Sequence, residues 1–182
     1  MARKLILFFS ISFIVIASAV SVCHAELHPC LYSGSNGPTE SKGCLESKKS
    51  GELQVTSRTL AKLSFDEKGL TVIRDKVLGW TYVNKKGIIV ISGVATMDNW
   101  ADSFHDGLVR FSRNDKWGFA DRNGKEVVPP MYDGSYNFEN GIAKVCVGCH
   151  SEQESPESEY HTWTGGQWTC INTRGESVTC GP

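Results

Sequence analysis

The sequence predicts an all-β protein built as an array of short antiparallel hairpin repeats. Residues 116–145, KWGFADRNGKEVVPPMYDGSYNFENGIAKV, recur in looser form at 79–109 and again from Gln167, and a partial copy lies at 63–72. Self-similarity at a spacing of about 35 residues is typical of repeat arrays whose single units are too small to fold alone. Helical periodicity is weak beyond the N-terminal 25 residues, and only residues 57–63 favour a helix.

The best-defined copy reads as strands separated by turns. Residues 116–120 and 125–128 flank Asp121-Arg122-Asn123-Gly124, a polar segment that favours a type I turn closed by a left-handed glycine. Pro129 and Pro130 then remove two hydrogen-bond donors, so strand pairing must stop or move to an edge there. Asn140-Gly141 forms the next turn. We therefore expect a short, twisted β-unit.

Residues that recur at matching positions predict a structural role. One tryptophan per copy favours packing in a single hydrophobic spine, where each indole would bury about 200 Å². A ladder that stacks sugars or bases is the alternative. Two further tryptophans, Trp100 and Trp163, lie outside the repeat register and are candidates for exposed contacts. The recurring residues are Trp80, Trp117, Gly118 and Trp168, with the turn glycines Gly69, Gly87, Gly107, Gly124, Gly141 and Gly175.

Residues 116–145 resemble the unit of the bacterial WG-repeat (KWG) proteins. That unit begins Lys-Trp-Gly-aromatic-hydrophobic-Asp-x-x-Gly-Lys, continues through Pro-Pro-x-Tyr-Asp and ends in Phe-x-x-Gly-Leu-Ala-x-Val. The resemblance is looser over the rest of 63–178, where Thr169 follows Trp168 in place of glycine. It implies a β-rich repeat fold and carries no agreed reaction, so no catalytic residue is transferred. Some members carry a similar Cys-x-Gly-Cys…His…Gly-Gly-x-Trp segment, which here would run from Cys146 to Trp168.

The first 25 residues have the features of a cleaved signal peptide. Arg3 and Lys4 precede an apolar run, Leu5 to Val22, and the small residue Ala25 marks a cleavage edge. A retained membrane anchor is the first alternative, because the run has about the minimum length for a span. A lipid on Cys23 is the second. We expect an exported protein, periplasmic or secreted, that meets the membrane only through this segment.

Composition and spacing divide the chain into three parts. They are the signal peptide at 1–25, a polar cysteine-containing segment at 26–62, and a WG-type β-repeat region at 63–182 with an insertion at 146–166. Removing residues 1–25 changes the formal charge from −1 to −3. No basic stripe remains to neutralise phosphates, so we expect no nucleic-acid partner.

Six of the seven cysteines lie after the signal segment. An even number in an exported chain predicts disulfides, and six cysteines allow fifteen pairings. Cys30 and Cys44 enclose a loop rich in glycine and serine and pair easily. Cys170 and Cys180 flank the last predicted turn, but a regular hairpin places Cys170 opposite Ser177. A bridge between them therefore requires the strand end to curl back.

Cys146-Val147-Gly148-Cys149-His150 fits the C-x-x-C-H pattern of c-type haem attachment. The two cysteines would form thioethers and His150 would bind the iron. The motif continues a predicted strand into an acidic stretch, whereas haem attachment usually opens a helix. The second axial iron ligand would come from Met97, Met131 or His161.

Two other interpretations of Cys146 and Cys149 compete with haem. A zinc site would use both thiolates and His161, completed by His150 or Cys170, but it needs reduced sulfur in an oxidising compartment. A disulfide needs the chain to turn between them. Gly148 as the third residue of a type II turn would bring their Cα atoms within about 7 Å. A thiol–disulfide catalyst would need a helix at the first cysteine. We favour the structural disulfide, with no metal and no cofactor.

Catalysis is difficult to build from the remaining residues. The sequence holds no G-x-S-x-G, no H-E-x-x-H and no phosphate loop. We therefore expect an exported, non-enzymatic β-repeat protein that binds an envelope protein or a glycan such as peptidoglycan. The insertion 146–166 is the predicted binding loop, since long loops on rigid scaffolds often carry function. The alternative is a metal- or haem-bearing redox protein centred on Cys146, Cys149 and His150.

The mass of the exported protein tests these expectations together. We expect a chain that begins at Glu26 and contains neither haem nor lipid, with all six remaining cysteines oxidised. Intact mass spectrometry before and after alkylation of the unreduced protein measures this. Uptake of the alkylating reagent without prior reduction would contradict the predicted disulfides.

Overall fold

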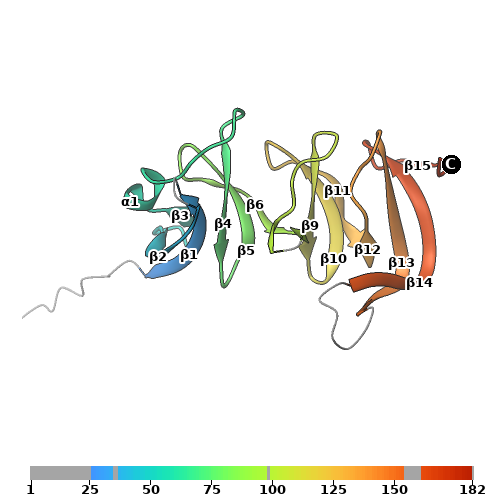
Figure 1. The fold of residues 1–182 in the computed structure, drawn as a ribbon, viewed down its shortest axis with the longest axis horizontal. Helices are drawn as coiled ribbons and strands as arrows, with labels where there is room; N and C mark the ends of the chain where they lie inside the picture. Colours follow the sequence, from blue (N-terminus) through green and yellow to red (C-terminus); the bar gives the residue numbers. More distant parts are fainter. Residues whose placement is uncertain (1–25, 35–36, 98, 154–160, 182) are drawn as a thin grey trace, which may run out of the picture.

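The computed structural model describes residues 26–34, 37–97, 99–153 and 161–181. The fold is nearly all β and its sheets are antiparallel, which confirms the predicted fold class. In Figure 1 the strands follow one another along the long axis of the molecule. The signal-peptide prediction for residues 1–25 lies outside the described residues. In the described part of the chain, no helix has both the length and the apolar character needed to span a bilayer.

The chain forms four consecutive three-stranded units. Unit 1 contains β1 (Leu27–Gly34), β2 (Gly37–Ser47) and β3 (Leu53–Val55). Unit 2 contains β4 (Leu70–Asp75), β5 (Gly79–Asn84) and β6 (Ile89–Val94). Unit 3 contains β9 (Leu108–Arg113), β10 (Lys116–Asp121) and β11 (Glu126–Tyr132). Unit 4 contains β13 (Ile142–Gln153), β14 (His161–Asn172) and β15 (Ser177–Val178).

Short elements connect these units. The helix α1 (Ser57–Leu60) lies within the segment where the sequence favours a helix, and Thr56 caps it by accepting a bond from the Thr59 amide. The remaining strands are β7 (Thr96–Met97), β8 (Trp100–Ala101) and β12 (Gly134–Ser135).

The units join edge to edge into two main sheets. Nine strands pair in the order β11-β10-β9-β6-β5-β4-β1-β2-β3, and four in the order β12-β13-β14-β15. A bridge between Gln54 and Ile88, with a bond from the Val55 amide to the Gly87 carbonyl, brings β3 back beside the start of β6. Units 1 and 2 therefore curl around a common core.

The turn between the second and third strands is built the same way in units 2, 3 and 4. In unit 3 the Asp121 carboxylate accepts bonds from the amides of Asn123 (2.8 Å) and Lys125 (2.9 Å). Asn84 and Asn172 accept the equivalent bonds in units 2 and 4. Each turn ends in a left-handed glycine, as the sequence predicts. These glycines are Gly87 (φ 75°), Gly124 (φ 81°) and Gly175 (φ 79°).

Residues 27–55 repeat this three-stranded pattern, although the sequence set 26–62 apart from the repeats. Lys48 stands where the other units have Asn or Asp, and the turn again ends in a left-handed glycine, Gly51 (φ 85°). Cys44 lies four residues before this turn, the position of tryptophan in the other units. Unit 1 thus has the backbone pattern of the other units but lacks their tryptophan and their Asn or Asp at the turn.

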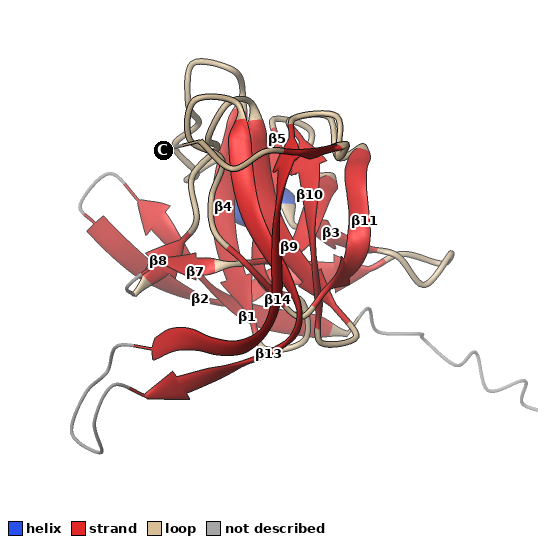
Figure 2. Ribbon diagram, turned by 90° about the vertical axis from the view of Figure 1, so that its right-hand side faces the viewer, coloured by secondary structure: helices blue, strands red, loops and turns tan. Residues whose placement is uncertain are grey.

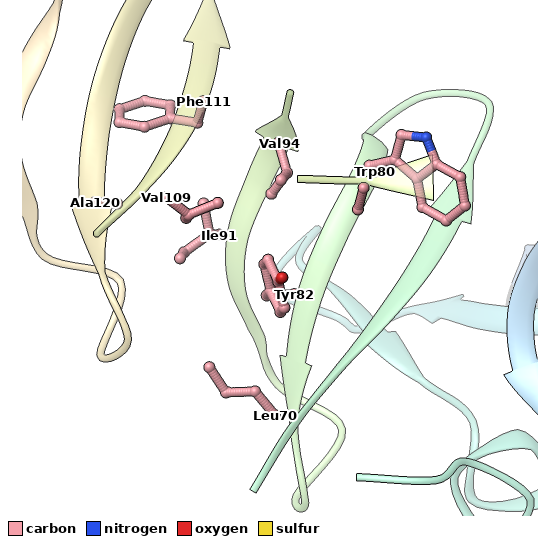
Figure 3. Close-up of a cluster of buried hydrophobic side chains, with 9 residues drawn as sticks. Leu70, Trp80, Tyr82, Ile91, Val94, Val109, Phe111 and Ala120 are labelled. Atoms are coloured by element: carbon pink, nitrogen blue, oxygen red, sulfur yellow. The ribbon is translucent and has the colours of Figure 1, made fainter. Parts of the chain in front are cut away.

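The hydrophobic core consists of three clusters, each lying between two consecutive units. Figure 3 shows the central cluster, which combines Trp80, Tyr82 and Ile91 of unit 2 with Val109 and Phe111 of unit 3, and in which Ile91 lies beside Val109. The cluster between units 1 and 2 contains Cys30, Tyr32, Cys44, Leu45, Val55, Leu63, Ile73 and Val83. The cluster between units 3 and 4 contains Leu108, Phe119, Val128, Phe138, Ala143, Val145 and Ile171.

The prediction of a single tryptophan spine is wrong for two of the three repeat tryptophans. Trp80 is buried and packs against Trp100, with ring centroids 4.6 Å apart. Trp117 and Trp168 are only partly buried and belong to none of the three clusters. Trp117 meets Trp163 from unit 4, and Trp168 is covered on one side by Tyr136. The cores instead form from the smaller apolar residues of adjacent units.

A buried ion pair connects the segment before unit 3 to strand β9 of unit 3, and from there to strand β12. The Asp102 carboxylate is fully buried, and the Arg110 Nε atom donates to its Oδ2 atom at 2.8 Å. Arg110 also donates to the Ser135 carbonyl at 2.8 Å, and the Asn137 amide donates to Asp102 at 3.2 Å. Removing one partner of such a pair leaves an uncompensated buried charge.

Gly118 lets two strands approach closely. Strand β11 bulges opposite it, because Trp117 pairs with Tyr132 and Phe119 with Val128. A Cβ atom on Gly118 would lie 2.5 Å from the Val128 carbonyl oxygen and 2.8 Å from the Pro130 nitrogen. The glycine that follows Trp117 is thus required by the close approach of the backbone from Val128 to Pro130, in an edge strand whose pairing resumes at Tyr132.

We expect Gly118→Ala to lower the free energy of unfolding by about 2 kcal/mol, because backbone atoms must move to admit the methyl group. Urea unfolding followed by tryptophan fluorescence measures this change. Gly43→Ala is the matched control, since a Cβ there would meet only the Leu27 side chain, at 3.3 Å. Equal unfolding midpoints for Gly118→Ala and the unmodified protein would contradict the close approach.

Candidate functional site

The described residues of the predicted insertion 146–166, namely 146–153 and 161–166, form the outer part of a long β13–β14 hairpin. Pairing continues from Cys149 opposite Gly165 to Gln153 opposite His161. Figure 2 shows this part, here called the hairpin arm, projecting from the body of the molecule. The arm comprises residues 146–153 and 161–166 among those described. It is therefore an ordered two-stranded extension of unit 4 over these residues.

Three glycines bend the arm where it leaves the sheet. Gly148 (φ 77°), Gly165 (φ 71°) and Gly166 (φ 68°) all adopt the left-handed conformation. A Cβ atom on Gly166 would lie 2.4 Å from the Cys149 nitrogen and 2.6 Å from the Val147 carbonyl oxygen. Only glycine permits this approach, so the bend is fixed by the sequence.

A disulfide joins Cys146 and Cys149 across the bend, with their Cα atoms 6.0 Å apart. The left-handed Gly148 between them is the geometry that the sequence analysis proposed for this bridge. Both cysteines are buried. In the disulfide neither sulfur is available for a haem thioether or for zinc.

The histidines of the haem and zinc hypotheses lie apart on the arm. His150 is exposed, and its Nε2 atom lies 2.8 Å from a Glu152 carboxylate oxygen. His161 is also exposed and pairs in register with Gln153, at the far end of the arm. Among the described residues, no group of three or more His, Cys, Asp or Glu side chains could hold a metal ion.

The other two disulfides join the pairs that the sequence considered. Cys30 pairs with Cys44 and Cys170 with Cys180. The expected register for Cys170 was wrong by one residue, since it lies opposite Val178 and not Ser177. The reason is a wider turn, in which the Asn172 amide donates to the Glu176 carbonyl. Cys180 is therefore two residues beyond the partner of Cys170, and β15 ends before it.

A cleft of about 340 Å³ lies where the arm meets unit 3. Two indoles form its apolar part, because Trp117 and Trp163 are partly exposed and meet edge to face, with centroids 5.9 Å apart and planes at 85°. Polar groups and the disulfide complete it. They belong to Ser112, Asp115, Asp133, Cys149, His150 and Ser151.

Gly134 of β12 positions Trp163 in this cleft. A Cβ atom on Gly134 would lie 2.7 Å from the indole Cδ2 atom and 2.8 Å from the Cys149 sulfur. The indole and the disulfide therefore rest directly on the β12 backbone. Arg110 lies over the Trp117 ring at 5.9 Å and supports the other indole.

Asp133 joins unit 3 to the bend of the arm. Its Oδ2 atom accepts a bond of 2.7 Å from the Gly148 amide, and its Oδ1 atom pairs with Lys116. The Gly148 bond, followed by the Lys116 bond, holds the pKa of Asp133 below its ordinary value of 3.8. On the arm, the bond from His150 holds the pKa of Glu152 low in the same way.

Asp115 contributes a carboxylate at the edge of the cleft. It and Asn114 form the two-residue turn between β9 and β10, and both have positive φ, 57° and 52°. Two left-handed residues are the requirement of a type I′ hairpin turn. Among the described residues, no side chain forms an ion pair with Asp115.

The three-stranded units and the cleft between two of them define a β-repeat protein. Residues 117–148 match the family model described as WG containing repeat. These residues thus form a WG repeat, and the resemblance found from sequence is confirmed over them. No curated protein and no solved structure is significantly similar to the chain.

Sequence reasoning found part of this cleft. It identified the Cys146–Cys149 disulfide, the insertion and Trp163 as a contact residue. The sequence predicted that Trp117 packs in the core, but Trp117 lines the cleft. It also predicted exposed contacts for both Trp100 and Trp163, but Trp100 packs against Trp80. Asp133 and Asp115 were missed as cleft residues. The sequence signal that could have identified Asp133 is the Tyr132-Asp133-Gly134 run, because it follows the bulge in the β10–β11 pairing.

We expect the Gly148 amide to report the protonation of Asp133. The pKa of Asp133 is lower in the folded protein than in a free aspartate. The bond from the Gly148 amide to the Asp133 carboxylate is therefore present at every pH above the free value, and it is lost only when the pH falls through the lowered pKa of the folded protein. The Gly148 amide resonance, followed by NMR during acid titration, should move with a midpoint below 3.8. In Asp133→Asn the resonance should lack this transition. A midpoint above 3.8 would contradict the assignment.

Proposed function

We propose that this protein is an exported, non-enzymatic binding module that holds a partner in the cleft between unit 3 and the hairpin arm. The observation that carries the proposal is the pair of partly exposed indoles, Trp117 and Trp163. Binding pockets combine apolar and aromatic walls with a few fixed polar groups, and this cleft has that composition. The disulfide and the glycine bend shape the wall formed by the arm, and Asp133 bonds that wall to unit 3 through the Gly148 amide and Lys116.

The chemistry of the cleft favours binding over catalysis. A general acid at neutral pH needs a raised carboxyl pKa, whereas the pKa values of Asp133 and Glu152 are lowered by their hydrogen bonds. The Asp133 carboxylate is also occupied on both oxygens, by the Gly148 amide and by Lys116. These two bonds hold Asp133 in a fixed position at the cleft, and its lowered pKa does not favour a role as a general acid.

Export is part of the proposal and rests on the disulfides and the predicted signal segment. Three cysteine pairs form bridges, and such bridges persist in oxidising compartments. A partner in the periplasm or outside the cell is then an envelope protein or a glycan. The mature chain has a formal charge of −3, which disfavours nucleic acid.

Co-sedimentation with cell-envelope fractions tests this function. We expect the mature, disulfide-bonded protein to pellet with purified peptidoglycan sacculi or to be retained by an envelope protein fraction, and Trp163→Ala to lose this retention. Trp168→Ala is the matched control, because it removes another partly exposed indole outside the cleft. Circular dichroism establishes that each variant is folded.

Two results would contradict the proposal. One is the absence of retention by every envelope fraction at concentrations where the protein is folded and oxidised. The other is equal retention of Trp163→Ala, Trp168→Ala and the unmodified protein.

A further inference from the structure

We infer that the cleft is a saccharide subsite that takes one uncharged sugar ring of a glycan, in contact with Trp117 and Trp163. This inference rests on the proposed binding function and names the chemistry of its ligand. A pyranose ring presents an apolar surface of C–H groups and a periphery of hydroxyl groups. The cleft offers the complementary arrangement, two flat apolar walls with polar groups around them.

The two indoles stand almost at a right angle, with ring planes at 85°. The Trp163 ring is held from behind by Gly134 and the Cys149 sulfur, and Trp117 by Arg110. Rigid aromatic walls contact a ligand with little loss of side-chain freedom on binding. A rigid, chair-shaped sugar ring loses less conformational freedom against such walls than a flexible chain does.

The polar residues of the cleft suit hydroxyl groups. Asp115 is exposed, has no ion-pair partner among the described residues, and is directed by a type I′ turn. A free carboxylate accepts hydrogen bonds from one or two ligand hydroxyls. Ser112 and Ser151 supply hydroxyl groups that donate or accept as the ligand requires. His150 adds an imidazole at the arm side.

The charges near the cleft disfavour an anionic ligand. Lys116 is paired with Asp133, and Arg113 with Glu126. Arg110 donates to Asp102 and to the Ser135 carbonyl. Each cation near the two indoles thus has an acceptor within the protein, while Asp115 has none. Within the part of the chain that the structure describes, a phosphate or carboxylate ligand would meet only Lys and Arg side chains that already have an acceptor.

The size of the cleft favours a sugar ring over a protein surface. Its volume of about 340 Å³ is at the lower end of the range of small-ligand sites. A stable protein interface uses about 20–30 residues on each side. Eight residues line this cleft. A short stretch of a glycan can therefore use it fully, whereas a folded partner would need a much wider surface.

Titration with a panel of uncharged tetrasaccharides tests the inference. The probes are tetramers of glucose, mannose, galactose and N-acetylglucosamine, added to the mature, oxidised full-length chain and followed by isothermal titration calorimetry. We expect saturable binding of at least one probe. Trp163→Ala should raise its Kd by about tenfold or more, and Trp163→Phe by about threefold or less, because phenylalanine keeps an aromatic wall.

Two further variants separate contact from folding. Asp115→Gly keeps the left-handed turn, since glycine accepts positive φ, and removes the carboxylate. We expect it to raise the Kd about fivefold with an unchanged thermal midpoint, which corresponds to the loss of one charge-assisted hydrogen bond. Trp168→Ala should bind the probe like the unmodified protein, because its indole lies outside the cleft.

Failure of the inference is distinguishable from failure of the proposed function. If no tetrasaccharide binds, or if Trp163→Ala and Asp115→Gly bind it unchanged, the saccharide assignment is wrong. If retention by the envelope fraction then depends on Trp163 and is removed by protease treatment of that fraction, the ligand is a protein and the binding function stands. Retention removed by digestion of the glycan would support the saccharide.

Discussion

The middle three-stranded units, 2 and 3, have apolar side chains on both faces, and this constraint determines the rest of the structure. Successive residues of a strand point to opposite faces, so Tyr82 enters the cluster shared with unit 3 while Val83 enters the cluster shared with unit 1. Neither face is covered unless a neighbouring unit is present. The cores are therefore interfaces, and no unit is expected to be stable alone. Arg110 and Asp102 add a buried polar connection that reaches from the segment before unit 3 to the β12 backbone.

The units at the two ends of the array meet this constraint differently from the middle ones. In unit 1, Cys44 takes the tryptophan position and is bonded to Cys30 inside the first core. In unit 4, Cys170 lies two residues after Trp168, where units 2 and 3 have Tyr82 and Phe119, and its bond to Cys180 covers this face. Among the described units, units 1 and 4 have a neighbouring unit on one side only. Each of these two units has a disulfide at a position where units 2 and 3 have an aromatic side chain.

The sequence predicted best those features that depend on residues close together in the chain. The turns need only an Asn or Asp and a glycine three positions later, and the Cys146–Cys149 bridge needs only Gly148. The cleft depends on contacts across 46 positions, from Trp117 to Trp163, and on a bend made by three separate glycines. No local pattern contains that information. Unit 1 was missed as a repeat for a related reason, since Cys44 and Lys48 replace the two residue types by which a copy is recognised.

The strands alternate in direction, so the Asn/Asp-glycine turns of units 2 to 4 gather at one border of the array (Figure 1). The opposite border carries the connections between the first and second strands. There the β4–β5 and β9–β10 connections are short, whereas strands β13 and β14 continue further and form the arm. The three core clusters between units do not include the residues of the arm, so the length of the hairpin at this border is not set by those clusters. The architecture therefore separates a framework of repeated units from a border where hairpins of different length are joined, and the short connections of units 2 and 3 are the places to graft other hairpins.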